Sequence, residues 1–165
     1  MNRRTTWMGL AAAAAGWRGL LAGGQVHAAQ PQPAREVAHT EADWKKLLTP
    51  AQFDVLRNGG TERPFSSPLD REKRAGMFSC AGCAQPLFSS RAKFDSGTGW
   101  PSFYEPVSRS AVDEQTDRTF GMKRTEVLCH RCGGHLGHVF DDGPKPTGLR
   151  YCMNGLALAF TPGTA

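Results

Sequence analysis

Five cysteines are the residues of this chain best suited to metal or redox chemistry, and four of them form two pairs of the same spacing. One pair is CAGC at 80–83 and the other is CHRC at 129–132. A tight turn within each pair can direct both sulfurs at one point, and four thiolates bind zinc tetrahedrally with no open coordination position. Two redox-active or disulfide-bonded pairs are the alternative, but two separated pairs of equal spacing favour zinc. We therefore predict one structural Zn2+ ion with four ligands: Cys80, Cys83, Cys129 and Cys132.

The fifth cysteine, Cys152, has no partner of this kind. It lies in the segment LRYCMN at 149–154, where the alternation of a β-strand puts Arg150, Cys152 and Asn154 on one face. A free thiol is mostly protonated at neutral pH, and Arg150 could supply part of the stabilisation that its anion needs. A buried, inert cysteine is the alternative, but the polar neighbours favour a reactive thiol.

Three histidines and a tryptophan lie in segments of unusual polarity. His135 and His138 could bind a metal, but no third ligand is nearby; they could instead exchange a proton beside a reactive thiol. His130, inside the second cysteine pair, is expected to be exposed or close to the metal without being a ligand. Trp100 lies in a loop of glycine and proline, where it could pack in the core or form an apolar wall for a small group.

The elements that must position these residues are mostly short strands. From Arg63 onward, alternating apolar runs are separated by turn residues. No amphipathic helix of about 10–15 residues lies between them, which argues against a doubly wound parallel sheet. We therefore predict a mainly β fold of curved, barrel-like antiparallel sheets. The expected strands are residues 76–80, 86–89, 92–95, 119–128, 138–141 and 149–160.

Two short peripheral helices are expected before the strands. Thr40 can cap the first helix, and Thr49 can cap the second, with proline at the first helical position and Gln52 completing a capping box. The predicted inward-facing residues are Trp44, Leu47 and Leu48 in the first helix and Phe53 and Leu56 in the second.

Composition and charge argue against some classes of function. With 165 residues, 39% hydrophobic and 21% charged, the chain fits one soluble globular domain with an N-terminal appendage. The net charge of +5 comes largely from Arg3, Arg4 and Arg18, in a leader without acidic residues. The rest is close to neutral, so we expect no nucleic-acid partner. No apolar run reaches about 18 residues, so no stable membrane span is expected.

Residues 1–28 have the layout of an export signal, with paired arginines, an alanine-rich apolar stretch and small residues up to Ala28, where cleavage is expected. The paired arginines resemble a twin-arginine signal, which predicts a periplasmic or otherwise exported bacterial protein. A mitochondrial transit peptide is the alternative. Residues 29–40 are expected to be a linker, and the folded domain is expected at 41–162.

From about Trp44 to Phe160 the sequence resembles the methionine-R-sulfoxide reductases, which reduce one epimer of methionine sulfoxide. The resemblance is carried by the two CxxC pairs, GWPSF at 99–103, RTEV at 124–127, HLGHVF at 135–140 and RYCMN at 150–154. It implies the zinc-containing form of the family, with a curved, mainly antiparallel β fold and peripheral helices.

The resemblance also implies roles for individual residues. Cys152 matches the catalytic nucleophile, and the two cysteine pairs match the zinc ligands. His135, His138 and Asn154 match catalytic polar groups around the sulfoxide and the thiol. Trp100 matches the wall that holds the substrate methyl group. The implied substrate-binding residues are Trp100, Arg150 and Phe140.

The implied reaction is attack of the Cys152 thiolate on the sulfoxide sulfur while a histidine protonates the departing oxygen, which leaves a sulfenic acid. Many members carry a recycling cysteine where this chain has Thr98, so an external thiol, with a thioredoxin-like protein as the leading candidate, is expected to restore Cys152. The expected substrates are oxidised peptides or proteins, the expected role is repair of oxidative damage, and the expected state is a monomer.

Two other functional classes remain open at this point. A zinc-ribbon-like binding module without catalysis would leave an unpaired cysteine in a polar strand without a role. A metallohydrolase built on His130, His135 and His138 would leave four cysteines unused.

Overall fold

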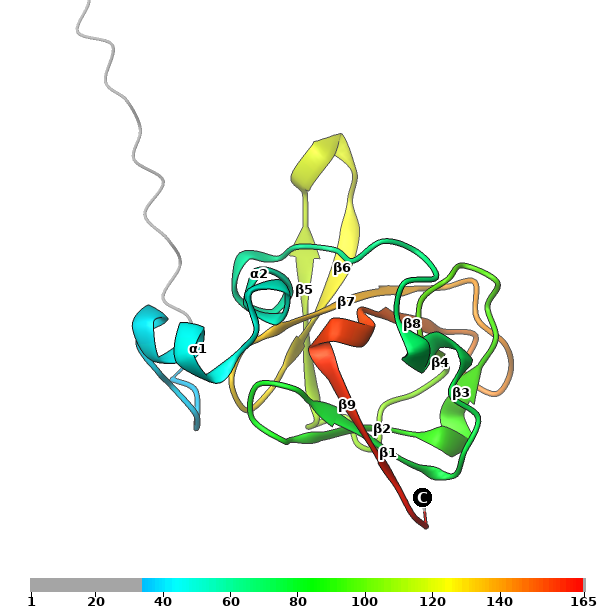
Figure 1. Ribbon diagram of the computed structural model, residues 1–165. Coiled ribbons are helices and arrows are strands. Elements are labelled where there is room, and N and C mark those ends of the chain that lie inside the picture. The colour runs from blue at the N-terminus through cyan, green and yellow to red at the C-terminus, as the bar shows by residue number, and fades with distance from the viewer. Residues whose placement is uncertain (1–33, 165) are drawn as a thin grey trace, which may run out of the picture. The chain divides into compact units, whose positions relative to one another are not determined.

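The computed structural model describes residues 34–164, in which two short α-helices precede the β-strands (Figure 1). The predicted export signal (1–28) and residues 29–33 of the predicted linker lie outside the described residues. The helices are α1 (Glu41–Leu47) and α2 (Pro50–Asn58). The strands are β1 (Gly76–Cys80), β2 (Pro86–Ser89), β3 (Lys93–Phe94), β4 (Ser102–Phe103), β5 (Val112–Asp117), β6 (Arg124–Cys129), β7 (His135–Phe140), β8 (Arg150–Met153) and β9 (Leu158–Pro162).

The strands form two antiparallel sheets, of order β2-β1-β9 and β3-β4-β8-β7-β6-β5. Aromatic side chains join them. The ring of Phe103 on β4 stacks on Phe88 of β2 with centroids 4.4 Å apart, and it meets the edge of Phe78 of β1 at 5.0 Å. All three rings are fully buried. The predicted mainly β, antiparallel fold is therefore confirmed.

Both helices begin at the expected threonines. The Thr40 hydroxyl accepts a hydrogen bond from the Asp43 N–H, and Thr49 forms a reciprocal capping box with Gln52. These local signals are read correctly from the sequence because each requires only residues within one turn of the chain.

The buried faces of the helices differ in part from the prediction. Trp44, Leu48 and Leu56 are buried as expected, but Leu47 is 60% exposed. Because α1 ends at Leu47 and the chain is extended at Leu48, only Leu48 reaches the core from this end of the helix. In α2, Val55 is also buried, while the expected Phe53 is half-buried.

The predicted strands at 76–80 and 86–89 are confirmed residue for residue. Four others were wrong in their limits, among them 92–95, of which only Lys93–Phe94 forms a strand, β3. The segment 119–128 contains a short 3-10 turn before β6 begins, 149–160 is interrupted by another, η4 (Gly155–Ala157), and 138–141 begins three residues too late. Two strands were missed, β4 because it has only two residues and β5 because its sequence, VDEQTD, is almost wholly polar.

A β-bulge brings two histidines to one face of β7. In a regular strand, His135 and His138 would point to opposite faces, because they are three residues apart. Here Val127 of β6 lies opposite Gly137, but the next residue, Leu128, lies opposite His135. Leu136 is therefore an extra residue in β7 with no opposite residue in β6. The bulge reverses the alternation, and both histidines share a face.

Gly137, at this bulge, allows β7 to approach β8 closely. A Cβ atom at Gly137 would lie 2.1 Å from the backbone oxygen of Cys152 and 3.0 Å from the Cα atom of Met153. A backbone atom cannot move aside as the end of a side chain can, so the pairing of the two strands at this point requires glycine.

The end of the predicted linker packs against the second cysteine pair. The Val37 N–H donates to the Arg131 oxygen at 3.0 Å, and Arg35 donates to the His130 oxygen at 2.9 Å and bonds to the Asp113 carboxylate. The chain is therefore held to the folded body from about Arg35 onward. Among residues 34–164, no helix has the length and hydropathy of a membrane span.

Candidate active site

The four paired cysteines converge on one point, where they could hold a metal ion. Their sulfurs all lie within 4.8 Å of one another, with Cys80 Sγ 3.8 Å from Cys132 Sγ and Cys83 Sγ 3.5 Å from Cys129 Sγ. Around tetrahedral zinc, with Zn–S bonds of about 2.3 Å, sulfurs lie about 3.8 Å apart. The first pair ends β1 and the second joins β6 to β7, so the cluster links the two sheets.

The histidines are not part of this cluster. His130 is exposed, and its Nδ1 atom lies 2.8 Å from Asp113 Oδ1. Within the described part of the chain, no second group of three or more histidines, cysteines and acidic residues has a metal-binding geometry. The spacing of His135 and His138 therefore does not produce a second metal site there.

Five polar side chains lie in register across five strands of the larger sheet. Cys152 on β8 lies between Ser102 of β4 and His138 of β7, Glu126 of β6 is opposite His138, and Gln115 of β5 is opposite Glu126. Directly opposed residues of antiparallel strands share a face, with Cβ atoms about 5 Å apart. The lone thiol thus lies beside a histidine on one side and a hydroxyl residue on the other.

Each of the two histidines on this face is bonded to a carboxylate. His135 Nδ1 lies 2.5 Å from Glu126 Oε1, and His138 Nε2 lies 2.9 Å from Asp117 Oδ2. The two ring centroids are 5.5 Å apart. Burial lowers the pKa of His138, although its hydrogen bond to Asp117 opposes this change.

A chain of hydroxyl groups approaches Cys152. Thr98 Oγ1 lies 3.8 Å from Cys152 Sγ, and Ser96 Oγ lies 2.8 Å from Thr98 Oγ1 and 2.7 Å from Ser102 Oγ. Burial raises the pKa of the Cys152 thiol, while hydrogen bonding from Thr98 and the charge of Arg150 oppose this rise without cancelling it.

Arg150 supplies part of the stabilisation of the Cys152 anion, as the sequence predicted, because its charge opposes the rise that burial causes in the pKa of the thiol. It lies on the Cys152 face, but its guanidinium donates two hydrogen bonds of 2.8 Å to Asp142 and lies 4.5 Å from the centre of the Phe140 ring. The guanidinium is therefore shared between Asp142 and the thiol. Strand β8 ends at Met153, and Asn154 follows it with extended backbone.

Asn154 and Trp100 are connected through one buried residue, Glu62. The Asn154 amide accepts from the Glu62 N–H at 3.0 Å and donates to the Leu136 oxygen at 3.1 Å. The Trp100 indole N–H donates to the Glu62 oxygen at 3.2 Å. The Glu62 carboxylate accepts from the N–H groups of Gly155 and Leu156, which begin η4. Glu62 thereby fixes both the tryptophan loop and the turn after β8.

Three residues at or near this site were missed from the sequence. Glu126 lies in the RTEV motif, which was noted without a role, and Asp117 lies in the unpredicted strand β5. Glu62 lies between two short helical segments, and no sequence motif marks it. Strand pairing brings Glu126 and Asp117 to the histidines, and Glu62 reaches its partners through packing on the turn after β8.

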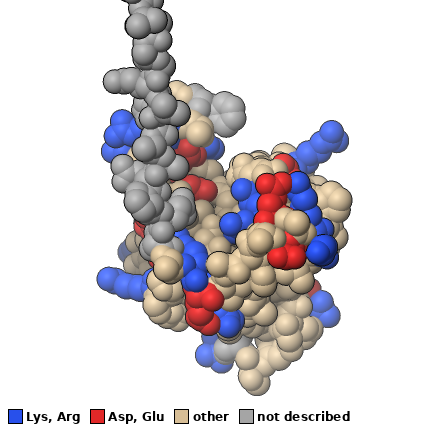
Figure 2. Space-filling model, turned by 90° about the vertical axis from the view of Figure 1, so that its left-hand side faces the viewer, with Lys and Arg blue, Asp and Glu red and all other residues tan. Residues whose placement is uncertain are grey.

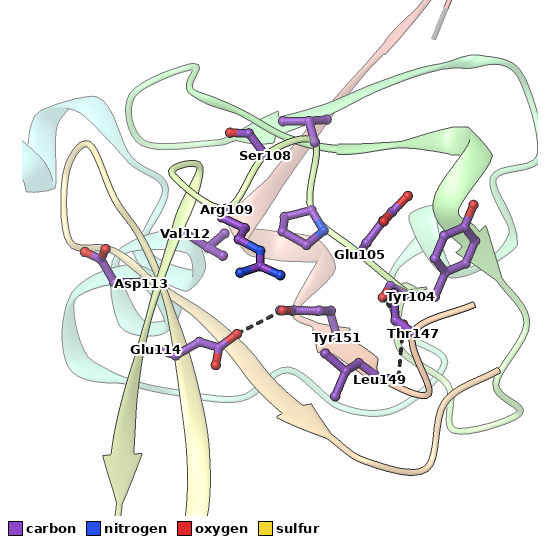
Figure 3. Close-up of a pocket in the computed structure, with 12 residues that line it drawn as sticks. Tyr104, Glu105, Ser108, Arg109, Val112, Asp113, Glu114, Thr147, Leu149 and Tyr151 are labelled. Atoms are coloured by element: carbon purple, nitrogen blue, oxygen red, sulfur yellow. Dashed lines mark hydrogen bonds between the residues drawn. The ribbon is translucent and has the colours of Figure 1, made fainter. Parts of the chain in front are cut away.

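A cavity of about 710 Å³ lies on the other face of β8, as Figure 3 shows. Tyr151, next to Cys152 but pointing to the opposite face, contributes its ring to this cavity and donates a hydrogen bond of 2.9 Å to Glu114. Arg109 projects into the same space. Cys152 is not among the residues that line this cavity, so its volume does not mark the thiol site.

Acidic and basic side chains are interspersed on the face of the molecule drawn in Figure 2. The structure as a whole contains paired charges, such as Arg35 with Asp113 and Arg131 with Glu36. Neighbouring charges of opposite sign reduce the long-range field of such a surface.

The chain matches the SelR domain model over residues 48–162. It is 55% identical over 127 residues to a peptide methionine sulfoxide reductase MsrB of Agrobacterium fabrum, an alignment that covers 77% of this chain and 94% of the relative. It is 56% identical over 126 residues to the MsrB of Methanosarcina mazei (76% and 90%) and 58% identical over 123 residues to that of Thiobacillus denitrificans (74% and 93%).

Replacing Thr98 tests the contribution of its hydroxyl to the thiol. Thr98→Val nearly keeps the shape of the side chain but removes the donor, so the pKa of Cys152 should rise further and less thiolate should be present at a given pH. We expect alkylation of Cys152 by iodoacetamide at pH 8 to slow about threefold or more, and the rate–pH curve to move to higher pH. Thr98→Ser, which keeps the hydroxyl, is the matched control. A curve for Thr98→Val that overlays the wild type would contradict this role.

Proposed function

The chain belongs to the SelR-domain family, and from this premise we propose that Cys152 is the nucleophile of its reaction. The protein is a peptide methionine sulfoxide reductase, an oxidoreductase that reduces the R epimer of methionine sulfoxide. The observation that supports Cys152 most directly is the register of β8, which sets the one cysteine outside the metal cluster directly between Ser102 and His138.

In the proposed reaction the Cys152 thiolate attacks the sulfur of the bound sulfoxide and forms a sulfur–sulfur bond, and the protonated oxygen leaves the substrate sulfur as hydroxide. The hydroxide then adds to the Cys152 sulfur as the sulfur–sulfur bond breaks. The substrate sulfur gains two electrons and leaves as methionine, while the cysteine sulfur loses two and becomes a sulfenic acid that carries the oxygen. Thr98 supports the anion before attack, because its hydroxyl is within hydrogen-bonding reach of the sulfur.

The oxygen must be protonated as its bond to sulfur breaks, because an unprotonated oxide is a poor leaving group. His138 or His135 is the proposed donor, since both rings lie on the face that carries Cys152 and each is already held by a carboxylate. Asn154, with its amide occupied by backbone groups, is proposed to support this end of the site by fixing the turn after β8.

The proposed substrate contacts are an aromatic wall and a paired arginine. The Trp100 indole, fixed by its hydrogen bond to Glu62, would hold the methyl group of the substrate, which determines the face of the sulfur that meets Cys152 and hence the epimer. Phe140 and Arg150, whose side chains stack on each other, would form another boundary of the substrate site further along the sheet. Oxidised peptides or proteins are the proposed substrates, with repair of oxidative damage as the role.

Return of Cys152 to the thiol requires a reductant from outside the chain. Thr98, and no second thiol, stands beside Cys152, and the other four cysteines are gathered in the four-cysteine cluster. We propose that one external thiol attacks the sulfenic acid and releases water, and that a second resolves the mixed disulfide. A thioredoxin-like protein supplies both thiols in one molecule, and the catalytic unit is proposed to be a monomer.

The Cys152→Ser variant tests the nucleophile. We expect it to remain folded and to lose reduction of an R-sulfoxide peptide by at least about 1,000-fold in the presence of a dithiol, because serine is a far weaker nucleophile toward sulfur. The S epimer and the Thr98→Ser variant are the controls. Turnover close to wild type would reject Cys152, and a wild-type chain that reduced neither epimer would instead support a zinc-ribbon-like binding module.

We propose that the four-cysteine cluster holds one zinc ion with a structural role. The closed set of four sulfurs, their spacing and their position between two sheets support zinc and leave no position for substrate. The ion would supply a cross-link between the turn after β1 and the turn before β7.

Zinc analysis and melting test this assignment. Wild-type and Cys152→Ser proteins should each carry one zinc ion per chain by elemental analysis. Cys129→Ser should lose the ion and melt lower by more than about 10 °C or fail to fold, because metal binding and folding are coupled. A metal-free Cys129→Ser protein with an unchanged melting temperature would argue against a structural ion, and loss of zinc from Cys152→Ser would make Cys152 a ligand.

We propose that residues 1–28 export the protein to the bacterial periplasm. The paired arginines and the small residues before Ala28 support this, with a mitochondrial address as the alternative. A fusion of residues 1–28 to a reporter that is active only after export should be periplasmic in a bacterium, and Arg3→Lys with Arg4→Lys should keep it inside the cell. Export that survives the double change would point away from the twin-arginine route.

A further inference from the structure

The carboxylate of Glu126 is fixed behind the histidines, and the mechanism above does not use it. One of its oxygens lies 2.5 Å from His135 Nδ1, and the other accepts a hydrogen bond of 2.7 Å from the Gln115 amide. The bulge in β7 creates the first contact, because without the extra residue His135 would point to the other face of the sheet.

The charge state of Glu126 determines which nitrogen of His135 carries hydrogen. Burial alone would raise the pKa of Glu126, but hydrogen bonds from His135 and Gln115 outweigh burial and lower it. An ionised carboxylate can only accept, so the hydrogen in this contact belongs to Nδ1 of His135. The Nε2 atom is left as the position where the ring can gain or lose a proton.

His135 Nε2 is buried and has no hydrogen-bond partner among the described residues. The whole residue is only 5% exposed, so bulk water does not solvate this atom freely. Buried polar atoms are almost always paired, and one that is not calls for a ligand that completes it. When the ring is protonated, Nε2 becomes a hydrogen-bond donor, and the oxygen of a sulfoxide is a strong acceptor that could pair with it.

We propose that Glu126 is a positioning residue, which holds His135 through Nδ1 so that Nε2 faces the sulfoxide oxygen and which stabilises the imidazolium that donates the proton. In this step the Nε2 proton passes to the oxygen of the breaking sulfur–oxygen bond, and the neutral ring keeps its Nδ1 hydrogen on Glu126. A carboxylate acts on a catalytic histidine in the same way in serine hydrolases. The proposal rests on the proposed function, since it needs a sulfoxide beside Cys152.

His138 is bonded through its Nε2 atom, whereas His135 is bonded through Nδ1, so experiments can distinguish the two histidines. The His138 Nε2 atom lies on Asp117, and Asp117 in turn accepts hydrogen bonds from Arg124 at 2.6 Å and from Thr119. A change at Asp117 should therefore alter the ring of His138, while a change at Glu126 should alter the ring of His135.

Other titratable and charged groups lie on β7 and on the elements next to it. They are Arg124 and Glu126 on β6, Asp117 on β5, His138 on β7, Cys152 on β8, Asp54 and Arg57 on the helix α2 that packs against β7, and Glu62, which Asn154 connects to the Leu136 oxygen. The test must therefore separate the effect of Glu126 from a general change of charge. Glu114 offers the matched control, because it lies on β5, next to β6, but bonds to Tyr151 on the other face of the sheet.

The experiment combines kinetics with nitrogen NMR of the histidine rings in the full chain. In resting wild-type protein, the neutral ring of His135 should be the tautomer with hydrogen on Nδ1. Glu126→Gln should lower kcat on an R-sulfoxide peptide by about 10–100-fold with KM changed less than about threefold. Because protonated His135 is needed and loss of the carboxylate destabilises it, the falling alkaline limb of the kcat profile should move to lower pH. Glu114→Gln should match the wild type, and Asp117→Asn should move the ring signals of His138 only.

Three results would overturn the proposal. They are a wild-type His135 ring with its hydrogen on Nε2, a kcat and pH profile for Glu126→Gln equal to those of Glu114→Gln, or equal responses of both rings to either change. If Glu126→Gln does not fold, Glu126→Asp, which keeps the charge and shortens the reach, supplies the same kinetic comparison. Retained turnover in Cys152→Ser would refute the nucleophile alone, because the NMR result on resting protein is independent of turnover.

Discussion

The pairing of β7 with β8 is the constraint on which the candidate site depends. It brings His138 opposite Cys152, and it is possible only because Gly137 lets the backbone of β7 come within contact of the Cys152 oxygen. The bulge beside that glycine then turns His135 to the same face. Two backbone irregularities in a six-residue strand thus assemble a thiol and two imidazoles that the chain separates by many residues.

The cysteine cluster and the aromatic core both hold the two sheets together, at different places. Phe78, Phe88 and Phe103 join the sheets through apolar contact, and the four sulfurs join the end of β1 to the turn between β6 and β7. The second of these turns leads directly into His135. The proposed ion would therefore fix the beginning of the strand that carries both histidines, although it has no contact with substrate in the proposed reaction.

The sequence predicts what is local and what is encoded by residue type. The CxxC pairs predict the sulfur cluster, because each pair needs only its own turn, and the capping threonines predict both helices for the same reason. Strand alternation predicts the faces of Tyr151 and Cys152 correctly. The contacts of Glu126 and Asp117 could not be predicted, because they depend on a register shift and on a polar strand, VDEQTD, that has no apolar alternation to mark it.

The full environment of Arg150 could not be predicted from the sequence either. Its distance along the chain from Cys152 suggested a partner for the thiolate, but Asp142 competes for the guanidinium and burial of the sulfur acts in the opposite direction. The balance among burial, hydrogen bonding and a shared cation is a property of the folded arrangement. A motif alone contains no information about which of these effects is largest.

The hydroxyl at position 98 has a consequence for the survival of the enzyme in the proposed cycle. Without a second thiol in reach, the oxidised sulfur persists until a reducing molecule collides with it, so its lifetime is inversely proportional to the concentration of that molecule. During this interval a peroxide can carry the sulfenic acid to the sulfinic acid, from which simple thiols do not recover it. The number of turnovers before inactivation then depends on whether the reductant or the peroxide reaches the sulfenic acid first. Because Cys152 is half-buried, access to its sulfur is restricted for both reagents.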